Sequence, residues 1–318
     1  SQARRVIVER LRPQVDGGRF PAKRTVGDEV TVLADVFADG HDLIAAVLHD
    51  RPVAPGGEGP WREARMSLVA PGTDEWSATF TAGGPGFHEY AVTAWIDRFA
   101  SWRKGLKAKA AAGQDVSVEL LEGSLMVQAA AARAEQVGST RGDAAWLAAQ
   151  ADALRAETPT EQRVALGLGD ALDGLMFTYA DRSDATHHPP VRIWVDRPVA
   201  RFGAWYEMFP RSAGPDPTRS ATFREAAGRL PAIADMGFDV LYLPPIHPIG
   251  ESYRKGPNNT LTAGPGDPGS PWAIGAAAGG HTAVEPGLGT LDDFDAFRGA
   301  AERLGLEIAL DLAWQCSP

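Results

Sequence analysis

Apolar and polar positions alternate with a period of two along the first third of the chain. Between residues 30 and 37, every second position holds an apolar side chain: Val30, Val32, Ala34 and Val36. This pattern is typical of a strand with one buried face. Apolar runs of similar length predict further strands over Val6–Leu11, Leu43–His49, Arg65–Val69, Trp76–Thr81 and Glu89–Ile96. Glycine- and proline-rich turns separate them, so residues 1–105 are predicted to form a β-sandwich.

The tryptophans of this region have two interpretations. We predict that Trp61, Trp76 and Trp95 belong to the sandwich core, because large aromatic side chains contribute most of their stabilisation when buried. The alternative is a platform on which a sugar ring stacks.

The period changes to that of a helix between residues 106 and 186, where alanine and leucine dominate. Leu120, Leu121, Leu125 and Val127 are predicted to lie near one helical face, and three more apolar groups follow, within 146–154, 164–168 and 172–176. Four short helices form a small bundle. Val191–Val195 predicts one more strand. We expect residues 191–196 to return to the β region, which makes the helices an insertion within it.

Residues 199–318 alternate between strands and helices. Strands are predicted over Arg201–Phe209, Val240–Leu243 and Leu306–Leu312, and helices over 223–234 and from the Thr290 cap to Arg303. This order predicts parallel strands joined by helical crossovers. A long Pro- and Gly-rich loop, 244–289, follows the second strand. Parallel α/β folds place active sites at that end of the strands.

Composition excludes several classes of protein. The net charge is -10 over 318 residues, so nucleic acid and anionic membrane surfaces are poor partners. The single cysteine, Cys316, allows no intrachain disulfide and suits a reducing compartment. No apolar run is long enough for a transmembrane helix, and no signal-peptide segment opens the chain. We therefore predict a cytoplasmic protein. The chain lacks an initiator Met, and we expect that both ends have been trimmed.

Polar residues that can carry chemistry gather after the predicted strands. Lys255 and Asn259 lie in the long loop, and Asp311, Gln315 and Cys316 follow the third strand. Charged, amide and aromatic groups of this kind build sugar pockets. Each residue also has a simpler interpretation: Lys255 as a solvated lysine, Gln315 as ordinary polar lining, Asp311 as a brace for the loop and Cys316 as an inert thiol. No spacing typical of a metal site or a phosphate-binding loop is present.

Several segments of residues 200–318 resemble the bacterial α-1,4-glucan:maltose-1-phosphate maltosyltransferases of the α-amylase superfamily. The matching segments are Arg201–Ser212, Pro244–Gly250, Arg254–Asn259, Ser270–Gly275, Gly279–His281, Leu288–Phe294 and Asp311–Pro318. Most α-amylase-type enzymes carry Asp-x-x-x-Asn-His after the third barrel strand. Gln315 and Cys316 replace its last two residues here, as they do in the maltosyltransferases. Residues 1–105 and 106–186 match the domain layout of the family, but their sequence signals are less specific.

The resemblance implies a fold and an activity. The fold is a multidomain one: an N-terminal β-sandwich with a helical-bundle insertion, followed by the first three βα units of a (β/α)8 TIM barrel. The family transfers maltosyl from α-maltose 1-phosphate to the non-reducing end of an α-1,4-glucan, with retention of configuration. The resemblance also implies a homodimer with the helical insertion, 106–186, at its interface, and no metal or organic cofactor.

The resemblance assigns substrate-binding roles to three residues. Lys255 and Gln315 are implied to bind the maltosyl unit, Asn259 is a weaker candidate for the more distant glucose, and Asp311 is a supporting residue. Retaining transfer needs a carboxylate nucleophile and a carboxylic acid. In the superfamily these follow the fourth and fifth barrel strands. No catalytic residue is therefore assigned here; both are expected downstream of Pro318, and this chain alone is expected to be an inactive N-terminal fragment.

Two other functions compete with this interpretation. One is a branching or debranching enzyme of the same superfamily with an N-terminal β-sandwich, which predicts Asn-His at positions 315 and 316. The other is not an enzyme: a glucan-binding module that uses the β-sandwich alone.

Overall fold

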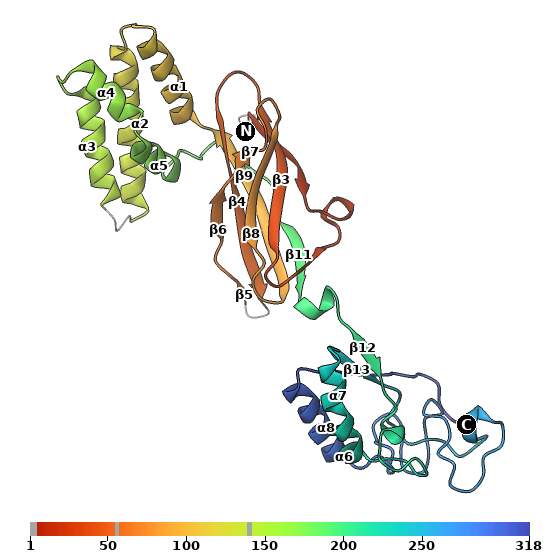
Figure 1. Ribbon diagram of the computed structural model, residues 1–318. Coiled ribbons are helices and arrows are strands. Elements are labelled where there is room, and N and C mark those ends of the chain that lie inside the picture. The colour runs from red at the N-terminus through yellow and green to blue at the C-terminus, as the bar shows by residue number, and fades with distance from the viewer. Residues whose placement is uncertain (1–4, 55–56, 139–141) are drawn as a thin grey trace. The chain divides into compact units, whose positions relative to one another are not determined.

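The computed structural model describes residues 5–54, 57–138 and 142–318. The chain divides into two compact units, Ser1–Arg197 and Pro198–Pro318. Each unit is described by itself, and Figure 1 shows the elements of both.

Two β-sheets form the core of the first unit. One is antiparallel, with the order β1 (Val6–Arg12), β3 (Glu29–Ala38), β8 (Glu75–Thr81), β7 (Ser67–Leu68). The other has the order β2 (Ala22–Thr25), β11 (Val191–Asp196), β9 (Gly86–Ile96), β4 (Ile44–Ala54), β5 (Gly57–Glu58), with β10 (Thr186–His187) on β9 and β6 (Arg62–Arg65) on β4. The second sheet is mixed, because β11 pairs parallel with β2 and antiparallel with β9.

The two sheets share one hydrophobic core. The predicted alternation of β3 is confirmed: Val30, Val32, Ala34 and Val36 are all buried. They pack in the same cluster as Tyr90 and Val92 of the second sheet. The strand predicted over Arg65–Val69 is instead two short strands. β6 pairs with β4 of the second sheet and β7 pairs with β8 of the first, so the chain crosses between the sheets at the buried Met66.

The three tryptophans have different environments. Trp76 packs against the shared core, and Trp95 is buried on the opposite face of the second sheet, with Val47 and Ala185. The prediction that Trp61 is a core residue is wrong, because its side chain is 40% exposed. Trp61 precedes β6 and lies against the Arg51 guanidinium, 4.2 Å from the ring centroid.

A helical region stands between β9 and β10 (Figure 1). Its described residues form α1 (Arg98–Ala111), α2 (Ser117–Gln136), α3 (Asp143–Arg155), α4 (Thr160–Gly167) and α5 (Asp170–Thr178). The first helix begins before the predicted boundary at residue 106, because the Asp97 carboxylate accepts a hydrogen bond from the Ala100 amide (2.8 Å) and caps it. The helices bury their own cluster, which includes Trp102, Leu120 and Leu147.

The apolar residues of α2 lie on two faces, and the predicted single face is wrong. Leu120 and Val127 are buried, whereas Leu121 and Leu125 are 52% and 55% exposed. Residues seven positions apart return to the same face of a helix, while adjacent residues are about 100° apart. Leu120 and Val127 therefore share the buried face, and the other pair is turned away from it.

The second unit contains three parallel strands, as predicted. They are β12 (Trp205–Glu207), β13 (Val240–Leu243) and β14 (Glu307–Leu310), with β13 in the centre. The first and third are shorter than predicted. The helix predicted over 223–234 is divided into α6 (Phe223–Ala226) and α7 (Leu230–Asp235) by a 3-10 turn, Ala227–Arg229. Pro231 in α7 has no amide proton for a bond across this turn.

The last helix of the second unit, α8 (Leu291–Arg303), begins where the sequence predicts. Thr290 and Asp293 form a reciprocal capping box at its start. The loop 244–289 contains no α-helix and no named strand, only a 3-10 turn at Pro257–Asn259. Besides this turn and the one at Ala227–Arg229, the described residues form 3-10 turns at Asp16–Gly18, Pro198–Ala200 and Pro210–Ser212. Among the described residues, no helix combines the length and the apolar character needed to cross a membrane.

Candidate functional site

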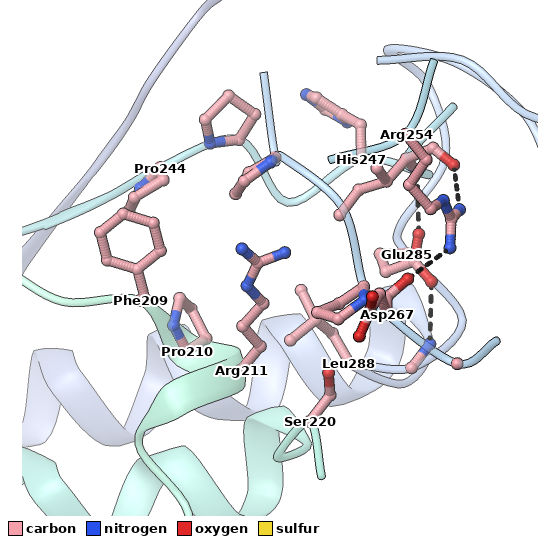
Figure 2. Close-up of a pocket in the computed structure, with 16 residues that line it drawn as sticks. Phe209, Pro210, Arg211, Ser220, Pro244, His247, Arg254, Asp267, Glu285 and Leu288 are labelled. Atoms are coloured by element: carbon pink, nitrogen blue, oxygen red, sulfur yellow. Dashed lines mark hydrogen bonds between the residues drawn. The ribbon is translucent and has the colours of Figure 1, made fainter. Parts of the chain in front are cut away.

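A cavity lies beyond the C-terminal ends of β12 and β13 (Figure 2). Its volume is ≈ 220 Å³. Its wall combines rigid prolines with charged side chains from two loops, 208–222 and 244–289. The lining residues are Phe209, Pro210, Arg211, Ser220, Pro244, Pro245, His247, Ile249, Arg254, Gly266, Asp267, Pro268, Pro271, Glu285, Gly287 and Leu288. The position agrees with the general rule for parallel α/β sheets, because strand ends aim successive loops at one crevice.

Arg254 and Glu285 hold the walls of this cavity together. The Arg254 guanidinium donates to the carbonyl oxygens of Ile249 (2.8 Å), Gly250 (3.1 Å) and Asp267 (3.0 Å). Glu285 accepts a hydrogen bond from the Ile249 amide at 2.9 Å. These bonds join distant parts of the long loop, so this part of the loop has a defined conformation despite its lack of regular structure.

Arg211 is the cation nearest the open centre of the cavity in Figure 2. It donates to the Gly269 carbonyl at 2.9 Å. Burial lowers the pKa of its guanidinium, and the charge of Glu285 acts in the opposite direction. A desolvated cation of this kind is suited to bind an oxygen-rich group, whether a hydroxyl or an anion.

Asp311 joins the end of β14 to the long loop. Its carboxylate accepts a hydrogen bond from the Trp272 indole at 2.6 Å, and the Trp272 ring lies edge-on to Phe209 at 5.9 Å. Hydrogen bonding to Asp311 raises the pKa of the Tyr242 phenol on β13 to about 12. Asp311 thus contacts a strand and a loop and acts as a structural support in this conformation.

The three residues implied to bind substrate lie outside this cavity. Lys255 is half-buried, and Asn259 is exposed at the end of the 3-10 turn with a positive φ of 62°. Gln315 is exposed, next to a backbone bridge between Cys316 and Ile274. Within the part of the chain that the structure describes, no hydrogen bond joins these three side chains to one another. Their shared role in substrate binding therefore stays a prediction.

A second, shallower hollow of ≈ 540 Å³ lies beside Gln315. Its lining is Glu251, Ser252, Ile274, Gly275, Ala276, Ala277, Gly279, Gly280, His281, Cys316, Ser317 and Pro318. His281 contacts the Ala313 carbonyl at 2.7 Å, and its ring lies 5.5 Å from that of His247. The loop after β14 and the loop after β13 are thus joined near the predicted substrate residues.

Sequence reasoning did not identify Arg211, Glu285 or His281 as site residues. The available signal was the position of Arg211, a charged residue two positions after the predicted strand Arg201–Phe209 and between Pro210 and Pro215. Charged residues in loops are usually solvated, so this signal is weak. Among the described residues, no group of three or more His, Cys, Asp or Glu side chains is arranged to hold a metal ion.

The chain is similar in sequence to proteins that share one description. Residues 4–197 match the family model described as alpha-1,4-glucan:maltose-1-phosphate maltosyltransferase, domain N/S. The maltosyltransferase of Chlorobaculum tepidum is 46% identical over 99% of this chain and 46% of its own length. Maltosyltransferase 1 of Streptomyces coelicolor is 49% identical over 99% of this chain and 46% of its own. An α-amylase structure from Lactobacillus plantarum matches 35% of this chain and 22% of its own at 35% identity, with a TM-score of 0.28.

The chain spans about half the length of the curated relatives it matches. The match to the family model covers most of the first unit, and the identity to the two maltosyltransferases extends through the second. The chain therefore belongs to the alpha-1,4-glucan:maltose-1-phosphate maltosyltransferase family.

Proposed function

We propose that this chain is the N-terminal part of an enzyme that transfers maltosyl from α-maltose 1-phosphate to the non-reducing end of an α-1,4-glucan and releases phosphate. The observation that carries the proposal is the 46–49% identity to enzymes with this name over nearly the whole chain. Gln315 and Cys316, in place of Asn-His, support a maltosyltransferase over a branching or debranching enzyme. The product is an elongated α-glucan of the glycogen type.

In this proposal, the three parallel strands begin a (β/α)8 barrel, and their loops supply one side of the donor pocket. Lys255 and Gln315 hydrogen-bond the maltosyl unit near the bond that breaks, and Asn259 contacts the more distant glucose. Asp311 keeps the loop after β14 in place through Trp272. The nucleophile and the acid are supplied by the part of the relatives' length that this chain does not match, so we expect phosphate release only from the full-length enzyme.

Replacement of the two donor-binding residues in the full-length enzyme tests the proposal. Lys255→Ala and Gln315→Ala should each lower kcat/KM for maltose 1-phosphate at fixed acceptor, equivalent to roughly 1–3 kcal/mol, because each removes a hydrogen-bond partner of the sugar. Lys107→Ala and Gln162→Ala, at exposed positions of α1 and α4, serve as matched controls with parent kinetics. Parent kinetics in the Lys255 and Gln315 variants would contradict the assignment. If the parent enzyme hydrolysed branched glucan and released no phosphate from maltose 1-phosphate, the debranching alternative would be favoured.

We also infer that the enzyme is a homodimer with α2 at the interface. Val118, Leu121 and Leu125 are 74%, 52% and 55% exposed, and their spacing places them along one side of the helix. A row of exposed apolar side chains is typical of a surface that another chain covers.

Light scattering on the full-length enzyme tests the dimer. Leu121→Glu together with Leu125→Glu should halve the apparent mass, because two buried charges have no partner at an apolar interface. The double variant Glu161→Gln with Gln162→Glu changes two exposed polar positions of α4, away from this row, and should leave the mass unchanged. A monomeric parent enzyme at micromolar concentration would contradict the inference. The lone thiol, Cys316, is exposed, which supports location in the reducing cytoplasm.

A further inference from the structure

The outward face of the second sheet carries a group of aromatic and charged side chains that the proposed transferase site does not use. Residues of β4, β9 and β11 alternate between the shared core and this outer face. At one end of the sheet, Phe177 and Ala180 pack over Trp95 and Val47 and cover the face. At the other end, Trp61, Phe87 and Arg192 are exposed above the buried Glu89. We call the residues of this end the sheet platform: Trp61, Arg51, Glu89, Arg192, Phe87 and Trp194.

The strand register orders the sheet platform into two rows. Arg51, Glu89 and Arg192 are direct partners across β4, β9 and β11. Glu89 accepts hydrogen bonds from Arg51 Nη2 (2.7 Å) and from Arg192 Nε (3.0 Å). In the next row, Phe87 is paired with Trp194, and the two rings meet edge to face at 4.8 Å.

Aromatic rings thus flank a fixed polar row. Trp61 lies against Arg51 at one end of the row, 4.2 Å from the guanidinium to the ring centroid. Phe87 and Trp194 lie beside the row, on the same strands as Glu89 and Arg192. Trp61 is 40% exposed and Phe87 is 38% exposed, although large apolar groups on a sheet are normally covered. Four adjacent strands span about 14 Å at the usual strand spacing, which is long enough for several sugar rings.

The chemistry of the sheet platform favours a neutral, hydroxyl-rich ligand. The cations of its polar row are bonded to Glu89, and the adjacent Lys23 is bonded to Asp196 (2.7 Å), so the surface has little charge left for a polyanion. A flat apolar protein surface would desolvate the Arg192 guanidinium, whose side chain is 58% exposed, without replacing its water contacts. A pyranose chain presents C–H faces to the rings and hydroxyls to the ion-paired side chains.

We propose that the sheet platform is a binding surface for a chain of α-linked glucose residues, separate from the donor pocket of the second unit. The choice of α-glucan among neutral oligosaccharides rests on the proposed function. Trp61 and Trp194 stack on the sugar rings, and the exposed Arg192 hydrogen-bonds their hydroxyls, while the buried Glu89 holds Arg51 and Arg192 in place.

Affinity electrophoresis of the 318-residue chain in gels that contain amylose tests the sheet platform. The parent chain should be retarded. Trp61→Ala and Arg192→Ala should each weaken retardation roughly tenfold in apparent Kd, with unchanged circular dichroism spectra. Trp146→Ala removes an equally exposed tryptophan (37%) from α3 and should behave like the parent chain. Lys107→Ala removes an exposed cation of α1 outside both sites and should behave like the parent chain. Lys255→Ala is compared with it to detect retardation through the donor pocket.

The proposal would be overturned if amylose did not retard the parent chain, or if the Trp61 and Trp146 variants were retarded equally. Retardation by dextran sulfate but not by amylose would overturn it as well. Loss of retardation only in Lys255→Ala would also overturn it and would assign binding to the second unit. The assay contains no maltose 1-phosphate. Its failure therefore concerns the sheet platform alone, whereas failure of the transferase proposal appears in the kinetics of the full-length enzyme.

Discussion

The pair Asp311 and Tyr242 shows how one residue at a strand end organises its surroundings. Asp311 follows β14, and Tyr242 lies on the central strand, β13. A carboxylate that accepts the phenol's hydrogen bond stabilises the neutral phenol, which is why the pKa of Tyr242 is raised to about 12. The same carboxylate accepts the Trp272 indole proton, so one side chain connects two strands and the loop.

We predict that Asp311→Asn lowers the pKa of Tyr242 from about 12 towards its ordinary value of 10.0. The raised pKa of a phenol means that its contribution to stability is complete below pH 10 and is lost as the pH rises through about 12. Ultraviolet titration of tyrosinate, with the Tyr242→Phe curve subtracted, measures this pKa. An unchanged midpoint in Asp311→Asn would show that another group holds the phenol in its neutral form.

At the residue scale, the sequence pattern predicted which side chains are buried more reliably than which residues contact one another. The alternation at Val30–Val36 was sufficient to place those side chains in the core. The sequence could not reveal that Glu285 bonds to Ile249 or that Arg254 bonds to three carbonyls of its own loop. Such bonds depend on how an irregular loop folds back, and no periodicity encodes that path. The roles of Lys255, Asn259 and Gln315 remain predictions for the same reason.

At the element scale, α1 and α2 are held together by contact between a ring and a backbone. Trp102 of α1 donates its indole proton to the Glu119 carbonyl of α2 at 2.7 Å. Its ring lies directly over Gly123, where a Cβ atom would overlap the ring carbons. Gly123 therefore permits the close approach of the two helices.

Gly123→Ala should destabilise the first unit by about 1–3 kcal/mol, because the added methyl group forces Trp102 out of its position. Gly105→Ala is the matched control. It also lies within a helix, but its Cβ would meet no atom, so it should stabilise by about 0.5–1 kcal/mol through helix propensity. Urea unfolding of the parent and both variants measures the two effects. Equal stability changes of the same sign would contradict the proposed ring contact.

Elements with local signals were predictable, and elements that depend on pairing were not. Thr290 and Asp293 identified the start of α8, because a capping box is encoded within four residues. The crossing of the chain between the two sheets at Met66 depends on the partners of β6 and β7. The break between α6 and α7, in contrast, has a local cause: Pro231 has no amide proton to continue one helix across the turn at Ala227–Arg229. The alternation pattern cannot distinguish one long strand from two short ones in different sheets.

At the scale of the whole molecule, the chain is divided at Arg197 and Pro198. The third region was predicted to begin at residue 199, directly after Pro198, which has no amide donor for a sheet. The two units differ in how completely their elements cover one another. In the first, two sheets enclose one core, and the helices bury another. In the second, the outer strands leave Trp205 and Leu310 59% and 43% exposed.

We therefore predict that a non-specific protease cleaves residues 198–318 of this chain before residues 5–197. The long loop, 244–289, offers backbone without helix or strand bonds, and local opening costs little free energy where few backbone bonds and apolar contacts must break. The first cuts should fall between residues 257 and 266, a mostly exposed stretch that lies between Arg254 and its partner Asp267. Limited proteolysis followed by mass spectrometry identifies them, and a stable fragment should end near residue 197. First cuts within β3, β4 or β9, or equal protection of both units, would mean that the second unit gains its stability from contacts other than those of its own sheet.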